Sequence, residues 1–369
     1  MTPAAITFVS SHAKRGGSER VLETLLEHLV RTGTPSVVVL EKGPFLQRLD
    51  ELGIDHEVIG CSGRVLSICK AALRLRRHLR RRKPELVHAN GVKAALVSVV
   101  ATIGMQIPVV WAKHDFSWDG RIGNLIARRA RLVVAVSTAL LSSFPHRLAS
   151  KLRVVHVGLH VPSGDRASAR AALQRLAGTT GPVVTLTGRL HSVKGHDDVI
   201  DIAGDVSAAI PGVRFAFIGG DDSSTPDVGK RLRDKVARLG LEGVAIFLGH
   251  RDDATELQRG ADVGLIPSVV DDRGMGREGF PLSGLELMAV GTPIVGYAHG
   301  GLPEMVGTCA RLVLPGDRNG LKRELIQLLK DDSRRRELSR CGTERATSEF
   351  TVDRMIQGMT AAYSEALRS

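Results

Sequence analysis

Two cations that could bind a single anion follow a short β-branched run in the second half of the chain. Arg189 and Lys194 are five residues apart in the segment Thr187–His196, which follows the strand-like run Val183–Thr187. Open α/β sheets bind ligands just after the carboxyl ends of their strands. Arginine gives a planar fork of donors and lysine a mobile point charge, a pair that suits a diphosphate. The alternative is two solvated surface cations, but the position after a strand favours binding.

Two carboxylates lie eight residues apart in the segment Arg277–Val295. Pro281 suits the first position of a helix and Gly291 the residue after its end, so we expect Glu278 in a loop and Glu286 on the helix. Carboxylates in these places can each accept hydrogen bonds from hydroxyl pairs of a long, sugar-rich ligand. The alternatives are a loop carboxylate without a ligand and an exposed helix residue.

A glycine pair follows the first strand-like run of the chain. Gly16 and Gly17 lie in the segment Ser10–Arg20, and we expect a helix to begin at about Ser18. Glycines let the backbone approach a ligand closely, and a helix N-terminus offers free N–H groups to an anion. The segment is not G-x-G-x-x-G, which disfavours dinucleotide binding. A tight β–α turn without a ligand is the alternative.

Strand-like runs alternate with helix-length amphipathic segments along the whole chain, which predicts parallel β-α-β units. We therefore expect an α/β protein with two Rossmann-like parallel sheets of about six strands each. The glycine- and proline-containing segment Gly158–Asp165 is the expected linker. The predicted domains are 1–160, completed by a helix at 350–369, and 161–349. The predicted strands are Ile6–Ser10, Ser36–Leu40, Glu85–His88, Val109–Lys113, Leu132–Val136, Arg153–Val157, Val183–Thr187, Arg214–Ile218, Val244–Leu248, Val263–Pro267, Pro293–Gly296 and Leu312–Leu314.

The positive charge of the chain is concentrated in its first half. The 369 residues carry a formal charge of +12, with 43% hydrophobic and 24% charged residues, a balance that excludes disorder. Residues 1–164 hold 24 Lys and Arg against 11 Asp and Glu, a net charge of +13, so the remainder is close to neutral. A basic half should attract an anionic partner. Nucleic acid is not expected, because only 4% of the residues are aromatic and no recognition motif is present.

A strongly basic helix is predicted at Lys70–Lys83. One interpretation is a peripheral membrane element that binds anionic lipid headgroups. The other, which we favour because aromatic anchors are missing, is a solvated helix face packed by its leucines. In either case the expected apolar stripe is Leu66, Cys69, Leu73 and Leu79.

The cysteines and the acidic pairs indicate neither a disulfide nor a metal site. Cys61, Cys69, Cys309 and Cys341 are scattered and contain no C-x-x-C pair, which is typical of a reduced, cytoplasmic protein. The longest apolar run, Ala94–Met105, is too short to span a bilayer. We expect caps and turns, without a metal, at three acidic pairs that lack D-x-D spacing: Asp221–Asp222, Asp252–Asp253 and Asp271–Asp272.

Taken together, these segments resemble the retaining glycosyltransferases of family 4, which have the GT-B fold. The resemblance covers almost the whole chain in the expected order. It departs between the domains, where the family commonly has N-G-V-D and this chain has Val157–His160. The matching motifs are G-G-x-E-R at Gly16–Arg20, V-H-A at Val87–Ala89, H-D at His114–Asp115, A-V-S at Ala135–Ser137, G-R-L…K-G at Gly188–Gly195, E-x7-E at Glu278–Glu286 and G-T-P-I-V…G-G-L-P-E at Gly291–Glu304.

The resemblance implies a metal-independent hexosyltransferase without a cofactor. Two domains would face each other across a cleft, and the last helix would cross back to the first domain. The donor would be a UDP- or GDP-linked sugar, and the acceptor a hydroxyl of a glycan, a lipid-linked saccharide or a small natural product. A cytoplasmic protein, peripheral on the inner membrane face if the basic helix binds lipid, would suit such a reaction. A GT-B epimerase acting on the nucleotide sugar and a non-catalytic nucleotide-sugar-binding protein are the alternatives.

The resemblance also assigns roles to single residues. Arg189 and Lys194 would neutralise the donor diphosphate, Glu278 would bind hydroxyls of the transferred sugar, and Glu286 would bind the ribose. Gly16 and Gly17 would close over the diphosphate, and His114 would contact the sugar near the acceptor. The catalytic set would thus be His114, Arg189, Lys194 and Glu278. The backbone of Gly279, Phe280 and Leu282 would lie against sugar and phosphate.

Overall fold

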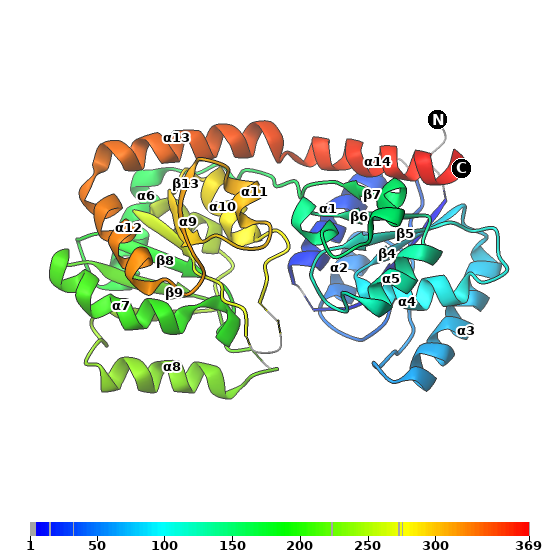
Figure 1. Cartoon of the computed structure of the whole chain (residues 1–369), viewed down its shortest axis with the longest axis horizontal. Helices are drawn as coiled ribbons and strands as arrows, with labels where there is room; N and C mark the ends of the chain where they lie inside the picture. The colour runs from blue at the N-terminus through cyan, green and yellow to red at the C-terminus, as the bar shows by residue number, and fades with distance from the viewer. Residues whose placement is uncertain are drawn as a thin grey trace. The chain divides into compact units, whose positions relative to one another are not determined.

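The computed structural model divides the chain into two compact units (Figure 1). Unit 1 comprises Met1–Gly158 and Val352–Ser369, and unit 2 comprises Leu159–Thr351. The sequence had placed these divisions after residues 160 and 349. The structure describes residues 5–14, 16–31, 33–222, 224–271, 274 and 276–368.

Unit 1 is built on a parallel sheet with the order β3-β2-β1-β4-β5-β6-β7 among its described residues. The strands are β1 Ile6–Ser10, β2 Ser36–Val39, β3 His56–Val58, β4 Leu86–Asn90, β5 Val109–Lys113, β6 Leu132–Ala135 and β7 Leu152–Val154. The helices are α1 Gly17–Leu29, α2 Phe45–Glu51, α3 Val65–Arg82, α4 Val92–Ala101, α5 Arg121–Arg129, α14 Val352–Arg368 and the 3-10 turns η1 Thr138–Leu141 and η2 His146–Lys151.

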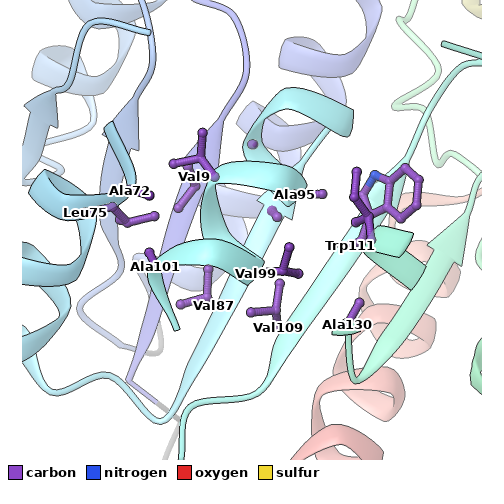
Figure 2. Close-up of a cluster of buried hydrophobic side chains, with 14 of the residues drawn as sticks. Val9, Ala72, Leu75, Val87, Ala95, Val99, Ala101, Val109, Trp111 and Ala130 are labelled. Carbon is purple, nitrogen blue, oxygen red and sulfur yellow. The ribbon is translucent and has the colours of Figure 1, made fainter. Parts of the chain in front are cut away.

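Both faces of the unit 1 sheet are covered, so its strands are apolar on both sides. Helices α3, α4 and α5 pack on one face, where Leu75, Val87 and Trp111 belong to a single buried cluster (Figure 2). Helices α1, α2 and α14 pack on the other face, with Leu86 of β4 in their cluster. Because side chains alternate along a strand, His88 and Asn90 of β4 share that second face with Leu86.

Unit 2 is built on a parallel sheet with the order β10-β9-β8-β11-β12-β13. The strands are β8 Val183–Thr187, β9 Arg214–Ile218, β10 Ala245–Gly249, β11 Val263–Ile266, β12 Ile294–Tyr297 and β13 Ala310–Val313. The helices are α6 Arg166–Ala177, η3 Ser192–Lys194, α7 His196–Ala209, α8 Asp227–Arg238, α9 Ala254–Gly260, α10 Leu282–Ala289, α11 Leu302–Val306, α12 Arg318–Lys330 and α13 Asp332–Glu349.

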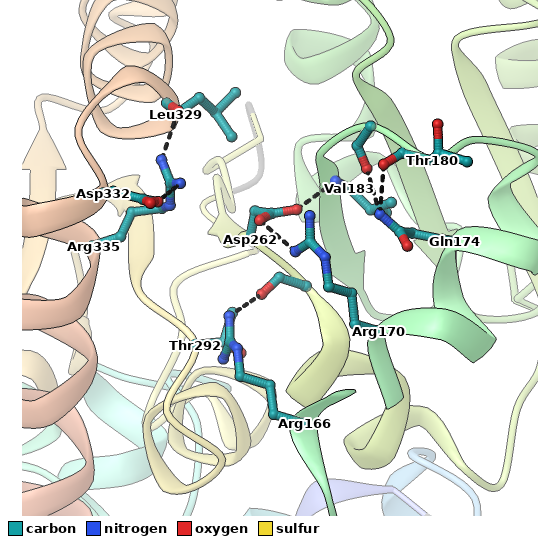
Figure 3. A network of polar contacts seen from close by, with 12 residues as sticks. Arg166, Arg170, Gln174, Thr180, Val183, Asp262, Thr292, Leu329, Asp332 and Arg335 are labelled. Carbon is teal, nitrogen blue, oxygen red and sulfur yellow. Dashed lines mark hydrogen bonds and ion pairs between the residues drawn. The ribbon is translucent and has the colours of Figure 1, made fainter. Parts of the chain in front are cut away.

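A polar network at the amino-terminal ends of β8 and β11 ties α6 to the unit 2 sheet (Figure 3). Arg170 of α6 donates to Asp262 Oδ1 at 2.6 Å, and Asp262 Oδ2 accepts from the backbone N–H of Val183 at 2.8 Å. Arg166 donates to the carbonyl oxygens of Ala261 and Gly291. This network therefore stabilises the packing of α6 at the amino-terminal ends of the strands, away from their carboxyl ends.

The prediction that the cysteines stay unpaired is wrong for one pair. Cys309, just before β13, and Cys341 of α13 form a disulfide with a Cα–Cα distance of 5.3 Å, whereas Cys61 and Cys69 are free. The two paired residues are 32 positions apart, and only the packing of α13 within unit 2 brings them together. The reduced state predicted from cysteine spacing therefore does not hold for this pair.

The apolar stripe predicted for the basic helix is also wrong. Helix α3 buries Ile68, Ala71, Ala72, Leu75 and Leu79, so only Leu79 of the predicted set packs inward. Leu66 is 77% and Leu73 58% exposed, and Cys69 is exposed as well. Within the described ranges, none of the helices combines the length and apolar character that crossing a membrane requires.

Candidate functional site

The strand order of unit 2 reverses between β8 and β11, which is the point where open α/β sheets form ligand sites. The segments that leave these two strands are joined directly. The backbone N–H of Val269, after β11, donates to the carbonyl oxygen of Val193, after β8, at 2.9 Å. Gly195 has φ +76°, and a Cβ there would lie 1.9 Å from the carbonyl oxygen of Pro267. Only glycine therefore allows this approach.

Lys194 and Glu278 meet at this reversal point. Lys194 Nζ donates to Glu278 Oε1 at 2.6 Å, and the Ser268 hydroxyl donates to the same oxygen at 2.8 Å. The side chains of Lys194 and Glu278 are 26% and 18% exposed. Burial alone would raise the pKa of Glu278, but the charge and hydrogen bond of Lys194 and the hydrogen bond of Ser268 outweigh it, so this pKa is lowered. Glu278 is thus a carboxylate anchored by a cation.

The G-G-L-P-E segment holds the backbone of Glu278. The N–H of Gly301 donates to the Glu278 carbonyl oxygen at 2.8 Å. Gly300 has φ +59°, and a Cβ there would lie 2.2 Å from that same oxygen. His299 faces the carbonyl oxygen of Ser268 through Nε2. The segments after β8, β11 and β12 therefore converge on Lys194 and Glu278.

Arg189 has a carboxylate partner within the chain that the sequence did not indicate. Its Nη1 pairs with Asp222, which follows β9 and is 1% exposed, while the Arg189 side chain is 64% exposed. Lys194 lies nearby, because its methylene stem covers Gly188. Each of the two cations thus carries a carboxylate partner, so this part of unit 2 is a set of four charges close to neutrality rather than a cluster of unpaired cations.

The E-x7-E segment is largely buried. Helix α10 begins at Leu282 with Pro281 as its N-cap residue, so the prediction of Pro281 as the first helical residue is off by one position. Glu286 is 4% exposed, which excludes the alternative of an exposed helix residue. Gly279 is buried too, and the Phe280 ring packs against Phe350 with a centroid distance of 5.3 Å. Phe280 thereby fixes the start of α10 through its side chain.

The glycine pair of unit 1 begins α1, with Gly16 as the N-cap residue and Gly17 as the first helical residue. Glu19, in the first turn of α1, is 4% exposed, and its Oε1 accepts a hydrogen bond from the Ser18 hydroxyl at 2.9 Å. Burial raises the pKa of Glu19, and the hydrogen bond from Ser18 and the charge of His12 only partly oppose it. A Cβ at Gly16 would lie 2.8 Å from Glu19 Oε2, so a buried carboxyl group of the chain lies beside the glycine pair.

His114 follows β5 of unit 1, and its Nε2 contacts Asn90 Oδ1 at 2.7 Å. Asn90 ends β4, 2% exposed, and also contacts His88. Burial lowers the pKa of His114 to about 4 and that of His88 to about 3. His88 Nδ1 in turn contacts the Tyr363 hydroxyl of α14 at 2.8 Å. A buried polar chain therefore links α14 to His114.

No group of three or more His, Cys, Asp or Glu side chains with metal-binding geometry occurs in the part of the chain that the structure describes. Asp222 accepts from the backbone N–H of Ser224 at 2.9 Å, a turn contact of the kind predicted for it. Asp253 precedes α9 but makes no capping bond through its side chain and instead pairs with Arg251. Asp272 lies outside the described residues.

Four residues position the others: Glu19, Asn90, Asp222 and Ser268. Sequence reasoning assigned no such role to them and predicted Asp222 only as a cap or turn residue. Three of them follow a strand closely, since Asn90 ends β4, Asp222 follows β9 and Ser268 follows β11. Polar residues at strand carboxyl ends are a usable signal. Their partners lie between 24 and 33 positions away for Asn90 and Asp222, so no local pattern identifies the pairs.

Two family models match most of the chain. Residues 15–161 match the model described as Glycosyltransferase Family 4, and residues 181–331 match that of Glycosyl transferases group 1. A D-inositol 3-phosphate glycosyltransferase of Acidothermus cellulolyticus is 32% identical over 74% of this chain and 62% of its own length. A mannosylfructose-phosphate synthase of Agrobacterium fabrum is 27% identical over 67% of this chain and 56% of its own length. The chain thus spans a little over half the length of these relatives.

Among solved structures, Anabaena HepE in complex with UDP-glucose has a TM-score of 0.84 at 24% identity, covering 98% of this chain and 100% of that one. This likeness shows the fold. The chain belongs to the family 4 glycosyltransferases, and its two parallel-sheet units are those of the GT-B fold.

Proposed function

We propose that this chain transfers a hexosyl group from a nucleoside diphosphate sugar to an acceptor hydroxyl, with retention of configuration and without a metal. The observation that carries the proposal is the contact of Lys194 and Ser268 with Glu278 at the point of strand reversal in unit 2. The UDP and UDP-glucose complexes of HepE support a uridine donor over a guanosine donor.

In this reaction the unit 2 residues would bind the donor. An ammonium group has three N–H donors, and Glu278 takes one of those of Lys194. The other two can turn to a phosphate oxygen while Glu278 holds the nitrogen in place. Arg189, whose Nη1 pairs with Asp222 while most of its side chain is exposed, would supply the second cation. A fixed array of this kind stabilises charge on the leaving diphosphate without reorganising during the reaction.

The carboxylates would select the sugar part of the donor. Lys194 and Ser268 both contact Oε1 of Glu278, so Oε2 can accept hydrogen bonds from sugar hydroxyls. Glu286 would accept from the ribose, and the backbone of Gly279, Phe280 and Leu282 would line the phosphates. In unit 1, Gly16 and Gly17 would approach the diphosphate and His114 the sugar. The departing phosphate oxygen can itself take the proton of the acceptor hydroxyl.

A donor-binding and activity test decides between transfer and its alternatives. UDP and GDP are first compared by thermal shift, and the preferred diphosphate is then offered as its glucose, galactose, mannose and N-acetylglucosamine forms. We expect Glu278→Gln to lower sugar release and transfer by about 10²- to 10³-fold, the cost of losing one preorganised polar contact, while the protein stays folded. The matched control is Glu337→Gln, at an exposed carboxylate of α13.

The outcomes are distinct. Near-normal turnover of Glu278→Gln would contradict the role of Glu278. Epimerised nucleotide sugar in place of released diphosphate would support the epimerase alternative. Binding of a diphosphate without turnover of any sugar would support the non-catalytic one.

We also propose that the exposed face of α3 binds an anionic membrane surface, which would bring the enzyme to a lipid-linked acceptor. Leu66 and Leu73 are exposed with Lys70 and Arg77 beside them on one stripe of the helix. Apolar side chains that insert between headgroups, flanked by cations, are what an interfacial helix needs. Each cation near an anionic membrane surface contributes about 1 kcal/mol to the free energy of membrane binding.

Vesicle flotation tests this contact. We expect the protein to float with vesicles of phosphatidylcholine and phosphatidylglycerol, and the bound fraction to fall at least tenfold for Leu66→Ser/Leu73→Ser. Leu239→Ser, at a leucine of unit 2 that is 52% exposed, is the matched control and should bind normally. Equal recovery with pure phosphatidylcholine vesicles, or no binding to either kind, would refute the proposal.

A further inference from the structure

Asn90 is buried at the centre of the polar chain in unit 1, and its contacts determine which way its amide points. Nδ2 lies 3.3 Å from the carbonyl oxygen of Ser18, in the first turn of α1. A backbone carbonyl can only accept a hydrogen bond. The NH2 group of Asn90 therefore faces Ser18, and its oxygen faces the histidines.

The direction of the amide determines the proton position on His114. Asn90 Oδ1 lies 2.7 Å from His114 Nε2, and an amide oxygen can only accept. The proton of the neutral imidazole must then be on Nε2, which leaves Nδ1 with the lone pair. A hydroxyl that meets Nδ1 has to donate its proton to it.

The neighbouring histidine fits the same assignment. The Tyr363 hydroxyl can donate to His88 Nδ1, which it approaches at 2.8 Å. His88 Nε2 then carries the proton and can donate to Asn90, whose side chain it contacts. In this arrangement the Tyr363 hydroxyl donates to His88 and the Asn90 amide donates to Ser18, and neither ring is charged. Burial lowers the pKa of both rings well below neutrality, in agreement with it.

We propose that Asn90 is a positioning residue that holds His114 as the Nε2-protonated tautomer and so makes Nδ1 a hydrogen-bond acceptor for a hydroxyl of the transferred sugar. The tautomer is a property of unit 1 alone, whereas its use in transfer rests on the proposed function. An aspartate at position 90 would also accept a hydrogen bond from His114 Nε2. Its negative charge, however, would favour the imidazolium form of His114, in which both ring nitrogens carry a proton and neither can accept a hydrogen bond. An amide is thus the side chain that fixes the tautomer and keeps the ring neutral.

The tautomer is measured directly by nitrogen NMR on the full chain labelled with ¹⁵N-histidine, at pH 7.5 and without any sugar. The His114 signals are identified by their loss in His114→Gln. We expect the Nε2-protonated form in the unaltered protein and a mixture of both tautomers in Asn90→Ala. The chemical shifts of Asn90→Asp should move toward the doubly protonated ring. Thermal unfolding and tryptophan fluorescence show whether each variant is folded, and Asn90→Ser replaces Asn90→Ala if it is not.

Kinetics test the use of the tautomer. With the donor sugar identified above, we expect Asn90→Ala to lower kcat about tenfold with little change in the donor KM, because the ring remains present but is no longer oriented. An Nδ1-protonated ring in the unaltered protein, or an unchanged tautomer in Asn90→Ala, would overturn the assignment. A shifted tautomer with unchanged kcat would overturn the role of Nδ1 in transfer. Failure of the donor site itself is seen separately, in Glu278→Gln.

Discussion

Replacing Lys194 by methionine is expected to lower transfer by about 10²- to 10³-fold, the typical cost of removing one preorganised electrostatic contact from a leaving group. The same change should destabilise unit 2 by about 2 kcal/mol, since a largely buried carboxylate that loses its cation keeps its desolvation cost. Glu278 is 18% exposed and retains only the Ser268 hydroxyl as a hydrogen-bonding partner at Oε1. Steady-state kinetics and urea unfolding measure the two effects.

A double variant separates activity from stability. In Lys194→Met/Glu278→Gln the uncompensated charge is gone, so stability should recover most of the loss while transfer stays low. Lys230→Met is the control, because Lys230 pairs with Asp234 at 2.6 Å on the surface of α8 with 79% of its side chain exposed. A surface ion pair of this kind contributes little to stability, so the transfer rate and the free energy of unfolding of Lys230→Met should both stay near normal. If the double variant were no more stable than Lys194→Met, the pairing of Lys194 with Glu278 would not be what stabilises this segment.

The sheets of both units could be predicted from the sequence because their strands are buried on both faces. Strands such as Val183–Thr187 and Arg214–Ile218 are rich in apolar and β-branched residues and lie between helical segments, and their bounds are confirmed. The strand β3, His56–Val58, was missed. It is a half-buried three-residue edge strand that contains a histidine and a glutamate, so it has neither the length nor the composition that marks a strand.

The position of the proposed donor site follows from the sequence, but the pairing of its residues does not. Arg189 and Lys194 could be located because they follow β8, yet Lys194 contacts Glu278, 84 positions away, and Arg189 contacts Asp222, 33 positions away. These pairs depend on the order of strands in the sheet. The order determines which strand ends are adjacent, and it is not encoded in any single segment.

A local contact could not be predicted either, because the same residues at the start of α1 allow two arrangements. The N-terminus of α1 can bind an external anion or the carboxyl group of Glu19 in its own first turn. The structure buries the Glu19 carboxyl group beside Gly16, where it accepts a hydrogen bond from the Ser18 hydroxyl. The burial of Glu19 is a property of how α1 packs on the sheet, and no local pattern indicates it.

The stability of unit 1 is expected to fall steeply as the pH drops from 7 to 5. Burial lowers the pKa of His88 from 6.5 to about 3 and that of His114 from 6.5 to about 4. A group with a lowered folded-state pKa stabilises the fold above its unfolded pKa of about 6.5, and this contribution is lost as pH falls toward the folded value. At 1.36 kcal/mol per pKa unit, each ring costs roughly 2 kcal/mol by pH 5. Glu19, with its raised pKa, acts in the opposite direction at the acid end of this range.

Tryptophan fluorescence can follow this loss in unit 1 alone, because both tryptophans of the chain, Trp111 and Trp118, belong to it. Urea unfolding at pH 7, 6 and 5 should give a free energy of unfolding that falls by about 4 kcal/mol across the range. Glutamine at position 88 cannot take up a proton, so His88→Gln should reduce this fall by about half. His146→Gln, at an exposed histidine of the same unit, should leave it unchanged. If the free energy of unfolding of His88→Gln fell as much between pH 7 and 5 as that of the unaltered protein, the protons taken up on unfolding would bind to groups other than His88.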